Sequence, residues 1–234
     1  MANKSTNIEA PDMVEANERE GRGGFLANYR LLAMIGVGLL VIVGGIWYYN
    51  YSRIEKNDQA QIELARIRPY YDRGEYATAI TGDPSKLIAG EKIKGLVALV
   101  SDWKSTPSGK IAALYLGDSY MATGKVQQAE EPFEIAAEAD APLVSSAAHA
   151  GLAAVAEATG QYEKAAEEYE KAASEDRVEL NTPDYLVAAA RNYERAGKKD
   201  EAIKNYRAVA TRFADSQANA AQARLALARY NVEL

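Results

Sequence analysis

The chain has 234 residues, with 27 Lys and Arg against 33 Asp and Glu, so its formal net charge is −6. This mild acidity argues against nucleic-acid binding, which depends on dense basic patches that release counterions. The chain contains no cysteine, which excludes disulfides, thiolate catalysis and cysteine-ligated metal sites. The redox compartment stays open, because a chain without cysteine suits both cytosol and periplasm.

The segment from Leu31 to Ser52 is an uninterrupted run of uncharged residues. Its 22 residues would span about 33 Å as a helix, enough for a hydrocarbon core of roughly 30 Å. We expect a transmembrane signal-anchor helix at 31–52, preceded by a disordered polar tail at 1–30. A buried core helix would need more apolar partners than the acidic flank offers, and a cleaved signal peptide would be shorter, with small residues before its cut.

Aromatic residues gather at both ends of this run, where a half-buried ring with a polar tip suits the lipid headgroups. The expected membrane-interface anchors are Tyr29, Trp47, Tyr48, Tyr49 and Tyr51. Basic residues flank the run on both sides, so the positive-inside rule does not decide its orientation. The glycines of the run lack GxxxG spacing, which makes self-association of the span a weak alternative.

One spacing of small and aromatic residues recurs three times in the second half of the chain. Its central glycines, Gly124, Gly160 and Gly197, are 36 and 37 residues apart, close to a 34-residue repeat period. We expect each copy to form a helical hairpin, with glycine in the turn and small residues that let the helices approach closely. Aromatic residues such as Phe133 should fill the space between neighbours.

The stretch LGDSYMATGKVQQAEEPFEIA resembles the tetratricopeptide repeat, and the resemblance covers roughly Lys110 to Leu234. It implies an all-α solenoid with three repeat units at 110–215 and a capping helix at 216–234. The expected stripe of the cap is Ala218, Ala221, Leu225 and Ala228. Thr182 is expected to be the N-cap of the third unit's first helix.

Residues 53–109 carry a degenerate version of the hairpin pattern. Thr81 to Pro84 interrupts it, and a helical face resumes at Ile93, Leu96, Val100 and Trp103. The order of tail, span, irregular hairpin and regular repeats is similar to that of YfgM-like ancillary Sec-translocon subunits. That resemblance implies a single-pass protein of the bacterial inner membrane with a periplasmic domain. Its implied protein partners are the Sec translocon, periplasmic chaperones or other membrane complexes.

Repeats of this kind bind peptides or helices in the trough lined by their first helices. Projecting that spacing onto the chain gives a candidate partner-binding trough, which consists of Ile111, Leu114, Asp118, Met121, Ala150, Ala154, Glu157, Val187, Arg191 and Glu194. Its apolar character favours an amphipathic helix or an extended apolar segment. Simple packing of Leu114 and Met121 between units is an equally good interpretation.

Nothing in the sequence favours catalysis, a cofactor or a small-molecule substrate. His149 is the single histidine, and no cysteine or second histidine can join it as a base or ligand. Acidic clusters such as Glu167, Glu168 and Glu170 are typical of solvated helix faces with nearby lysines. We therefore expect a membrane-anchored interaction scaffold, with an envelope-structural or assembly subunit that oligomerises through its span as the alternative.

Overall fold

In a computed structural model, residues 15–88 and 90–233 are described, and the chain forms two units, residues 1–52 and 53–234. Helix α1 (Glu15–Asp72) begins in the first unit. Its Leu31–Tyr48 stretch has a mean hydropathy of 2.3, and none of it is buried by protein. By length and composition this stretch is able to cross a membrane.

The expected disordered tail differs from the structure in part. Residues 1–14 lie outside the described residues, whereas 15–30 belong to α1. No proline follows Pro11 before the span, so nothing stops the helix of the span from extending toward the N-terminus. The polar composition of this segment is outweighed by the low cost of lengthening a helix that already exists.

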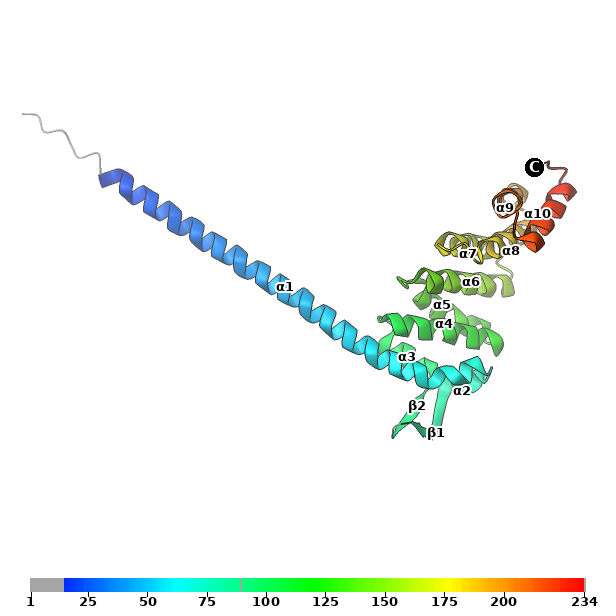
Figure 1. The fold of residues 1–234 in the computed structure, drawn as a ribbon, viewed down its shortest axis with the longest axis horizontal. Coiled ribbons are helices and arrows are strands. Elements are labelled where there is room, and N and C mark those ends of the chain that lie inside the picture. Colours follow the sequence, from blue (N-terminus) through cyan, green and yellow to red (C-terminus); the bar gives the residue numbers. More distant parts are fainter. Residues whose placement is uncertain (1–14, 89, 234) are drawn as a thin grey trace, which may run out of the picture. The chain divides into compact units, whose positions relative to one another are not determined.

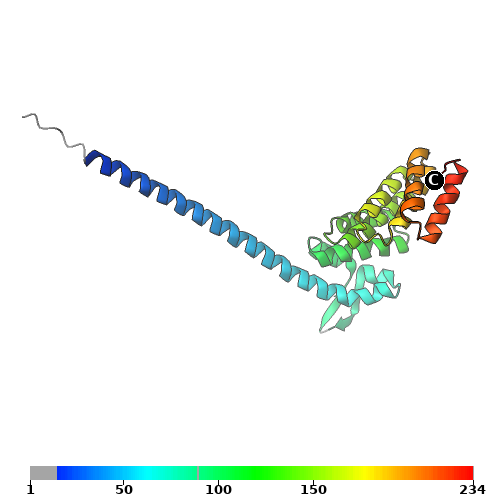
Figure 2. The ribbon, with the colours of Figure 1, turned by 45° about the horizontal axis from the view of Figure 1, so that its top comes forward.

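The second unit is a stack of helical hairpins, shown from two directions in Figures 1 and 2. Each helix from α4 onward packs against the next in sequence. The helices after α1 are α2 (Tyr76–Thr81), α3 (Leu96–Trp103), α4 (Pro107–Ala122), α5 (Val126–Ala137), α6 (Pro142–Ala158), α7 (Tyr162–Glu175), α8 (Thr182–Arg195), α9 (Lys199–Arg212) and α10 (Gln217–Arg229). The expected helical repeat architecture is therefore confirmed.

The three central glycines occupy the turns of the hairpins α4–α5, α6–α7 and α8–α9. Gly124, Gly160 and Gly197 have φ values of 74°, 76° and 77°, a region that glycine enters without the cost paid by other residues. In each turn the amide after the glycine donates to the carbonyl four residues before the glycine, always at 2.8 Å. The three turns are thus nearly identical, as the spacing predicted.

A strand pair that the sequence did not predict stands between α2 and α3. Strands β1 (Gly82–Ile88) and β2 (Glu91–Lys94) pair antiparallel, with an irregularity between Asp83 and Leu87. Ile93, which we expected on a helix, lies in β2 and is 3% exposed. The helical spacing was misleading because the buried face of the strand and that of α3 meet the same core.

The core of the first repeats closes around Phe133 of α5, which is 1% exposed. A Cβ atom on Gly117 of α4 or Gly151 of α6 would lie 2.6 or 2.4 Å from its ring. Two helices from neighbouring repeats therefore form a glycine-lined socket for the one aromatic side chain of Phe133.

Two local expectations were wrong. The buried face of α10 consists of Ala220, Ala223, Ala226 and Leu227, whereas Leu225 of the expected stripe is 70% exposed. Both stripes of this alanine-rich helix fit a helical period, so spacing alone did not separate them. Thr182 is the first residue of α8 and not its N-cap, and its hydroxyl donates to the buried Asp176 carboxylate.

Candidate protein-binding site

The predicted trough residues lie on α4, α6 and α8, the first helices of the three hairpins. Ile111, Leu114, Asp118, Met121, Ala150, Ala154, Glu157 and Glu194 are partly buried, Arg191 is exposed, and Val187 is buried. Val187 is 3% exposed because it packs in the core of the last two hairpins. It is therefore unavailable to a partner, and the candidate surface is smaller than the sequence indicated.

Contacts with α1 and α5 fix the part of the surface that α4 provides. Leu114 and Met121 pack against the Phe133 cluster, while Asp118 accepts a hydrogen bond from the Tyr71 hydroxyl at 2.9 Å. Tyr71 of α1 also stacks on Tyr115, with ring centroids 4.4 Å apart. Burial raises the pKa of Tyr71, and the Asp118 carboxylate raises it further. These contacts fix the position of α4 and leave few of its trough side chains free.

The α6 part is lined by small side chains with one charged residue at its end. Ala150 and Ala154 present only methyl groups, so a partner backbone can approach closely here. Glu157 forms an ion pair with Arg195 of α8 at 2.6 Å and accepts a longer hydrogen bond from Asn192 at 3.4 Å. This carboxylate therefore already connects two neighbouring repeats of the stack.

Glu194 plays the corresponding part on α8. Its carboxylate accepts hydrogen bonds from the hydroxyls of Tyr206 at 3.0 Å and Tyr230 at 2.8 Å, and Arg229 lies at 3.4 Å. Burial, followed by the hydrogen bond to Glu194, raises the pKa of Tyr206. Glu194 consequently ties α8 to α9 and α10 and is only partly available to a partner.

The sequence did not reveal a set of polar contacts with a common separation of one repeat. Four of them join residues 35 positions apart, namely Glu157 with Asn192, Glu170 with Asn205, Asp184 with Asn219 and Glu194 with Arg229. A solenoid places equivalent positions of adjacent repeats side by side. A search for complementary polar residues one period apart would have found these pairs.

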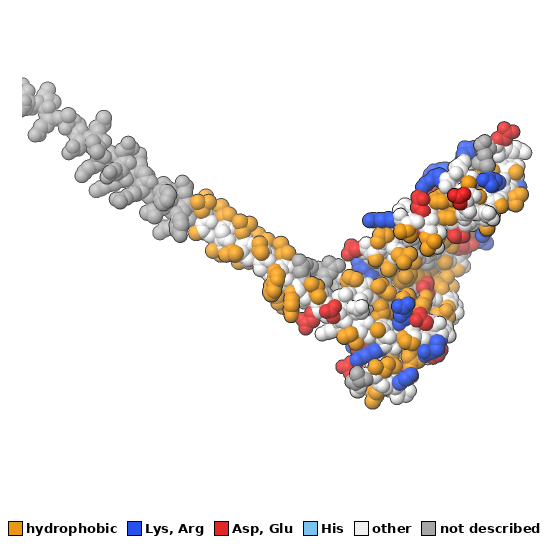
Figure 3. All heavy atoms as spheres, viewed as in Figure 1, with side chains coloured by type: hydrophobic (Ala, Val, Ile, Leu, Met, Phe, Trp, Pro, Cys, Tyr) orange, Lys and Arg blue, Asp and Glu red, His pale blue; other side chains and the backbone are white. Residues whose placement is uncertain are grey.

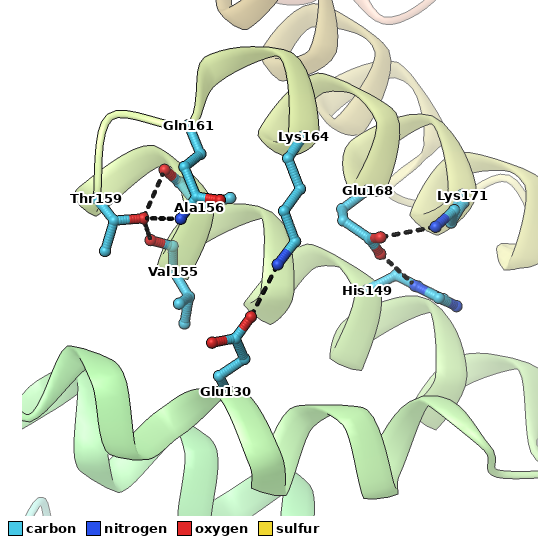
Figure 4. A network of polar contacts seen from close by, with 9 residues as sticks. All are labelled: Glu130, His149, Val155, Ala156, Thr159, Gln161, Lys164, Glu168 and Lys171. Atoms are coloured by element: carbon cyan, nitrogen blue, oxygen red, sulfur yellow. Dashed lines mark hydrogen bonds and ion pairs between the residues drawn. The ribbon is translucent and has the colours of Figure 1, made fainter.

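His149 is part of a polar network between α6 and α7, shown in Figure 4. Its Nδ1 lies 2.8 Å from Oε2 of Glu168, whose other oxygen accepts from Lys171 at 2.7 Å. Burial acts to raise the pKa of Glu168, but the hydrogen bonds from Lys171 and His149 together lower it below its ordinary value. The nearby Lys164–Glu130 pair, at 2.8 Å, joins α7 to α5. These contacts explain His149 as a residue of the interface between two helices.

Among the described residues, no group of three or more His, Asp and Glu side chains is arranged to hold a metal ion. The aromatic anchors are described in part. Trp47, Tyr48 and Tyr51 are exposed by 66%, 69% and 57%, and the rings of Trp47 and Tyr51 stack at 5.7 Å. The side chains of Tyr29 and Tyr49 lie outside the described residues.

Residues 97–143 and 114–178 match a family model described as tetratricopeptide repeat. A crystal structure titled "putative kinesin light chain nearly identical TPR-like repeats", from Podosopora anserina, is similar in fold. It is 20% identical, with a TM-score of 0.51, and the match covers 74% of this chain and 89% of that chain. A substituted variant of the same repeats is 22% identical with the same TM-score. That match covers 74% of this chain and 88% of the variant's chain. No curated protein matched the chain. The second unit thus has the fold of a tetratricopeptide-like solenoid.

Proposed function

We propose that the protein is a membrane-anchored scaffold that binds a segment of another protein on the first helices of its repeats. The proposal is supported by repeats of a kind that bind proteins and by an apolar helix able to span a bilayer. The observation that carries it is the exposure of Arg191 on α8, together with the methyl-lined surface of Ala150 and Ala154 on α6. Neighbouring carboxylates are already paired within the fold.

The chemistry of this surface favours an amphipathic helix. Small side chains on α6 allow a helix to approach closely, and Arg191 can pair with an acidic residue on the polar edge of that helix. Anchoring beside the membrane would raise the effective concentration of any partner that shares the membrane. A contact of modest affinity would then be sufficient.

The similarity of the chain's layout to YfgM-like translocon subunits extends this proposal. The domain at 53–234 would lie in the periplasm of a bacterium, with the anchor in the inner membrane. Its partners would be the Sec translocon, periplasmic chaperones or another membrane complex. Protease added to spheroplasts should then degrade the domain, whereas protection until detergent lysis would contradict this orientation.

Binding can be tested with a variant that changes the surface and leaves the core intact. Ala154→Arg combined with Arg191→Glu should abolish co-purification of the partner in mild detergent, because it blocks the methyl-lined surface and reverses the exposed charge on α8. Arg207→Glu makes the same charge reversal on an exposed position of α9 and should leave co-purification unchanged. Equal binding by both variants would contradict the proposal.

These positions are better probes than Leu114 and Met121. Both of those residues pack against the Phe133 cluster, so a charged substitution would disturb the fold as well as the surface. Retained helical circular dichroism is the required control for every trough variant.

Oligomerisation through the span is a second candidate function. A Cβ atom on Gly36, Gly38, Gly44 or Gly45 would meet no other atom within 4 Å, so these faces of α1 are free to meet another helix. Size analysis in mild detergent should then show an oligomer for the full chain and a monomer for residues 53–234. A monomer in both cases would remove this candidate.

A further inference from the structure

The loop between α7 and α8, residues 176–181, exposes two large apolar side chains. Val178 is 75% exposed and Leu180 is 72% exposed. An apolar side chain stabilises a fold through its removal from water, so neither residue contributes much to the stability of the chain itself. Exposed apolar side chains that adjoin one another are typical of surfaces that meet another protein.

The loop is held in one conformation by polar contacts. The buried Asp176 carboxylate accepts hydrogen bonds from the Asn181 amide at 2.6 Å and from the Thr182 hydroxyl at 3.1 Å. Glu179 has a φ of 52°, a left-handed conformation that is uncommon for residues other than glycine, and it forms an ion pair with Arg212 of α9 at 2.9 Å. A fixed loop that keeps an unfavourable backbone conformation and exposes apolar side chains indicates a role in recognition.

A groove of about 540 Å³ lies beside the loop and is lined by residues of α7, α8 and α9. This volume is within the range of protein binding pockets. Arg177 and Glu179 of the loop line the groove, whereas Val178 and Leu180 do not. The loop therefore directs charged side chains toward the groove and apolar side chains toward solvent in alternation.

The carboxylates that line the groove are already engaged within the fold. Glu170 accepts hydrogen bonds from the Tyr193 hydroxyl at 3.0 Å and from the Asn205 amide at 2.8 Å. Asp176 fixes the loop, and Glu179 is paired across the groove. Each acidic residue of the groove consequently has a partner before a ligand arrives.

Two basic residues of the groove are not engaged in this way. Among the described residues, the side chains of Arg177 and Lys204 make no hydrogen bond or ion pair. Figure 3 shows one face of the second unit, where basic and acidic side chains are interspersed with hydrophobic ones. The two unpaired cations are thus a local feature, and they leave the groove with hydrogen-bond donors to spare and no carboxylate without a partner.

We infer that Val178, Leu180 and the groove beside them bind a segment of another protein in which acidic residues adjoin apolar ones. The apolar residues of that segment cover Val178 and Leu180, and its carboxylates enter the groove and pair with Arg177 and Lys204. A basic segment is disfavoured, because it would bring its charge next to two cations while the carboxylates of the groove are occupied. This surface shares no residue with the first-helix surface of the proposed function, so the two can be tested separately.

The experiment selects peptides from a displayed library of random sequences, with the full chain in phosphatidylcholine nanodiscs as the target. Val178→Ser combined with Leu180→Ser removes the exposed apolar side chains of the loop. Leu225→Ser makes the same kind of change at a residue of α10 that is 70% exposed, and it is the matched control. Peptides enriched on the native chain and on the control, but not on the double variant, should have an excess of acidic residues beside apolar ones.

The selected peptides then test the groove. Arg177→Gln combined with Lys204→Gln should weaken their binding by about fivefold, as expected for the loss of two exposed ion pairs. Arg207→Gln combined with Arg224→Gln removes two cations from exposed positions outside the groove and should leave the binding unchanged.

Three results would overturn the inference. They are equal enrichment on the native chain and on the Val178→Ser, Leu180→Ser variant, selected peptides without an excess of acidic residues, and equal losses from the two pairs of Gln substitutions. Ala154→Arg combined with Arg191→Glu reports the first-helix surface and should not change binding of these peptides. A loss in that variant would place the peptides on the first helices and would also contradict the inference.

Discussion

The early and the late repeats are joined by different chemistry. Between α4, α5 and α6 the join is apolar, because Phe133 fills a socket lined by Gly117 and Gly151. From α7 to α10 an apolar core is supplemented by a polar join, in which tyrosine hydroxyls donate to the carboxylates of Glu170 and Glu194. The same backbone spacing is therefore compatible with two ways of fixing one unit against the next. A repeat signature predicts the stack, and the individual side chains decide how it is held.

Removing the ring of the apolar join should have the largest effect. Phe133→Ala should lower the free energy of unfolding by about 3–5 kcal/mol, because it leaves a cavity between three helices. Tyr206→Phe removes only one hydroxyl from the polar join and should cost about 1 kcal/mol. Urea unfolding of the detergent-solubilised chain compares the two, and equal losses would contradict the division into an apolar and a polar join.

Filling the socket should be the next largest change. Gly151→Ala places a Cβ atom 2.4 Å from the Phe133 ring, and overpacking of this kind costs about 1–3 kcal/mol. Ala158→Val, at an exposed position of the same helix, adds side-chain volume away from the socket and should cost only a few tenths of a kcal/mol. Phe133→Leu should partly rescue Gly151→Ala, and strictly additive losses would show that the ring is not the obstacle.

The polar join can be broken at its shared acceptor. Glu194→Ala leaves the hydroxyls of Tyr206 and Tyr230 without their acceptor, and an unpaired buried hydroxyl costs about 1–3 kcal/mol. Hydrogen exchange should show faster opening of α9 and α10, while the amides of α4 to α6 keep their protection. Uniform loss of protection would indicate that the two joins are coupled more tightly than the side chains imply.

The smallest predicted effect depends on pH. The pKa of Glu168 is lower in the folded chain than its ordinary value, despite burial, because Lys171 and His149 hydrogen-bond to it. Its contribution is therefore complete above the ordinary carboxyl pKa of about 4.3 and is lost as the pH falls through the lower folded value. The stability difference between the native chain and Glu168→Gln should be largest near pH 7 and should shrink below about pH 4. A constant difference between about pH 7 and about pH 3 would contradict this role.

Sequence spacing was sufficient for the helices and turns of the repeats, because Gly124, Gly160 and Gly197 adopt a turn conformation that other residues avoid. It was insufficient for β1 and β2, since Ile93 satisfies a helical period and a strand equally well. On α10 it selected the wrong stripe, because two alanine faces have the same period and only tertiary packing separates them.

The candidate site could be predicted only in outline. Spacing placed Ala154 and Arg191 on the first helices, but it could not show that Val187 is buried or that Glu157 and Glu194 are paired inside the fold. The burial of Val187 and the pairing of the two carboxylates depend on residues elsewhere in the stack. Many of those residues lie one repeat away, so the pattern of a single repeat does not include them.

If the protein is a scaffold of the proposed kind, its partner binds the first helices of the hairpins and not the second helices. Photoreactive amino acids placed in the full chain at Ala154 and Arg191, and separately at the exposed second-helix positions Gln127 and Arg207, test this binding in intact cells. We expect a crosslink to one and the same partner from Ala154 and Arg191 and none from Gln127 or Arg207. Crosslinks to that partner only from the second helices, or equally from all four positions, would contradict it.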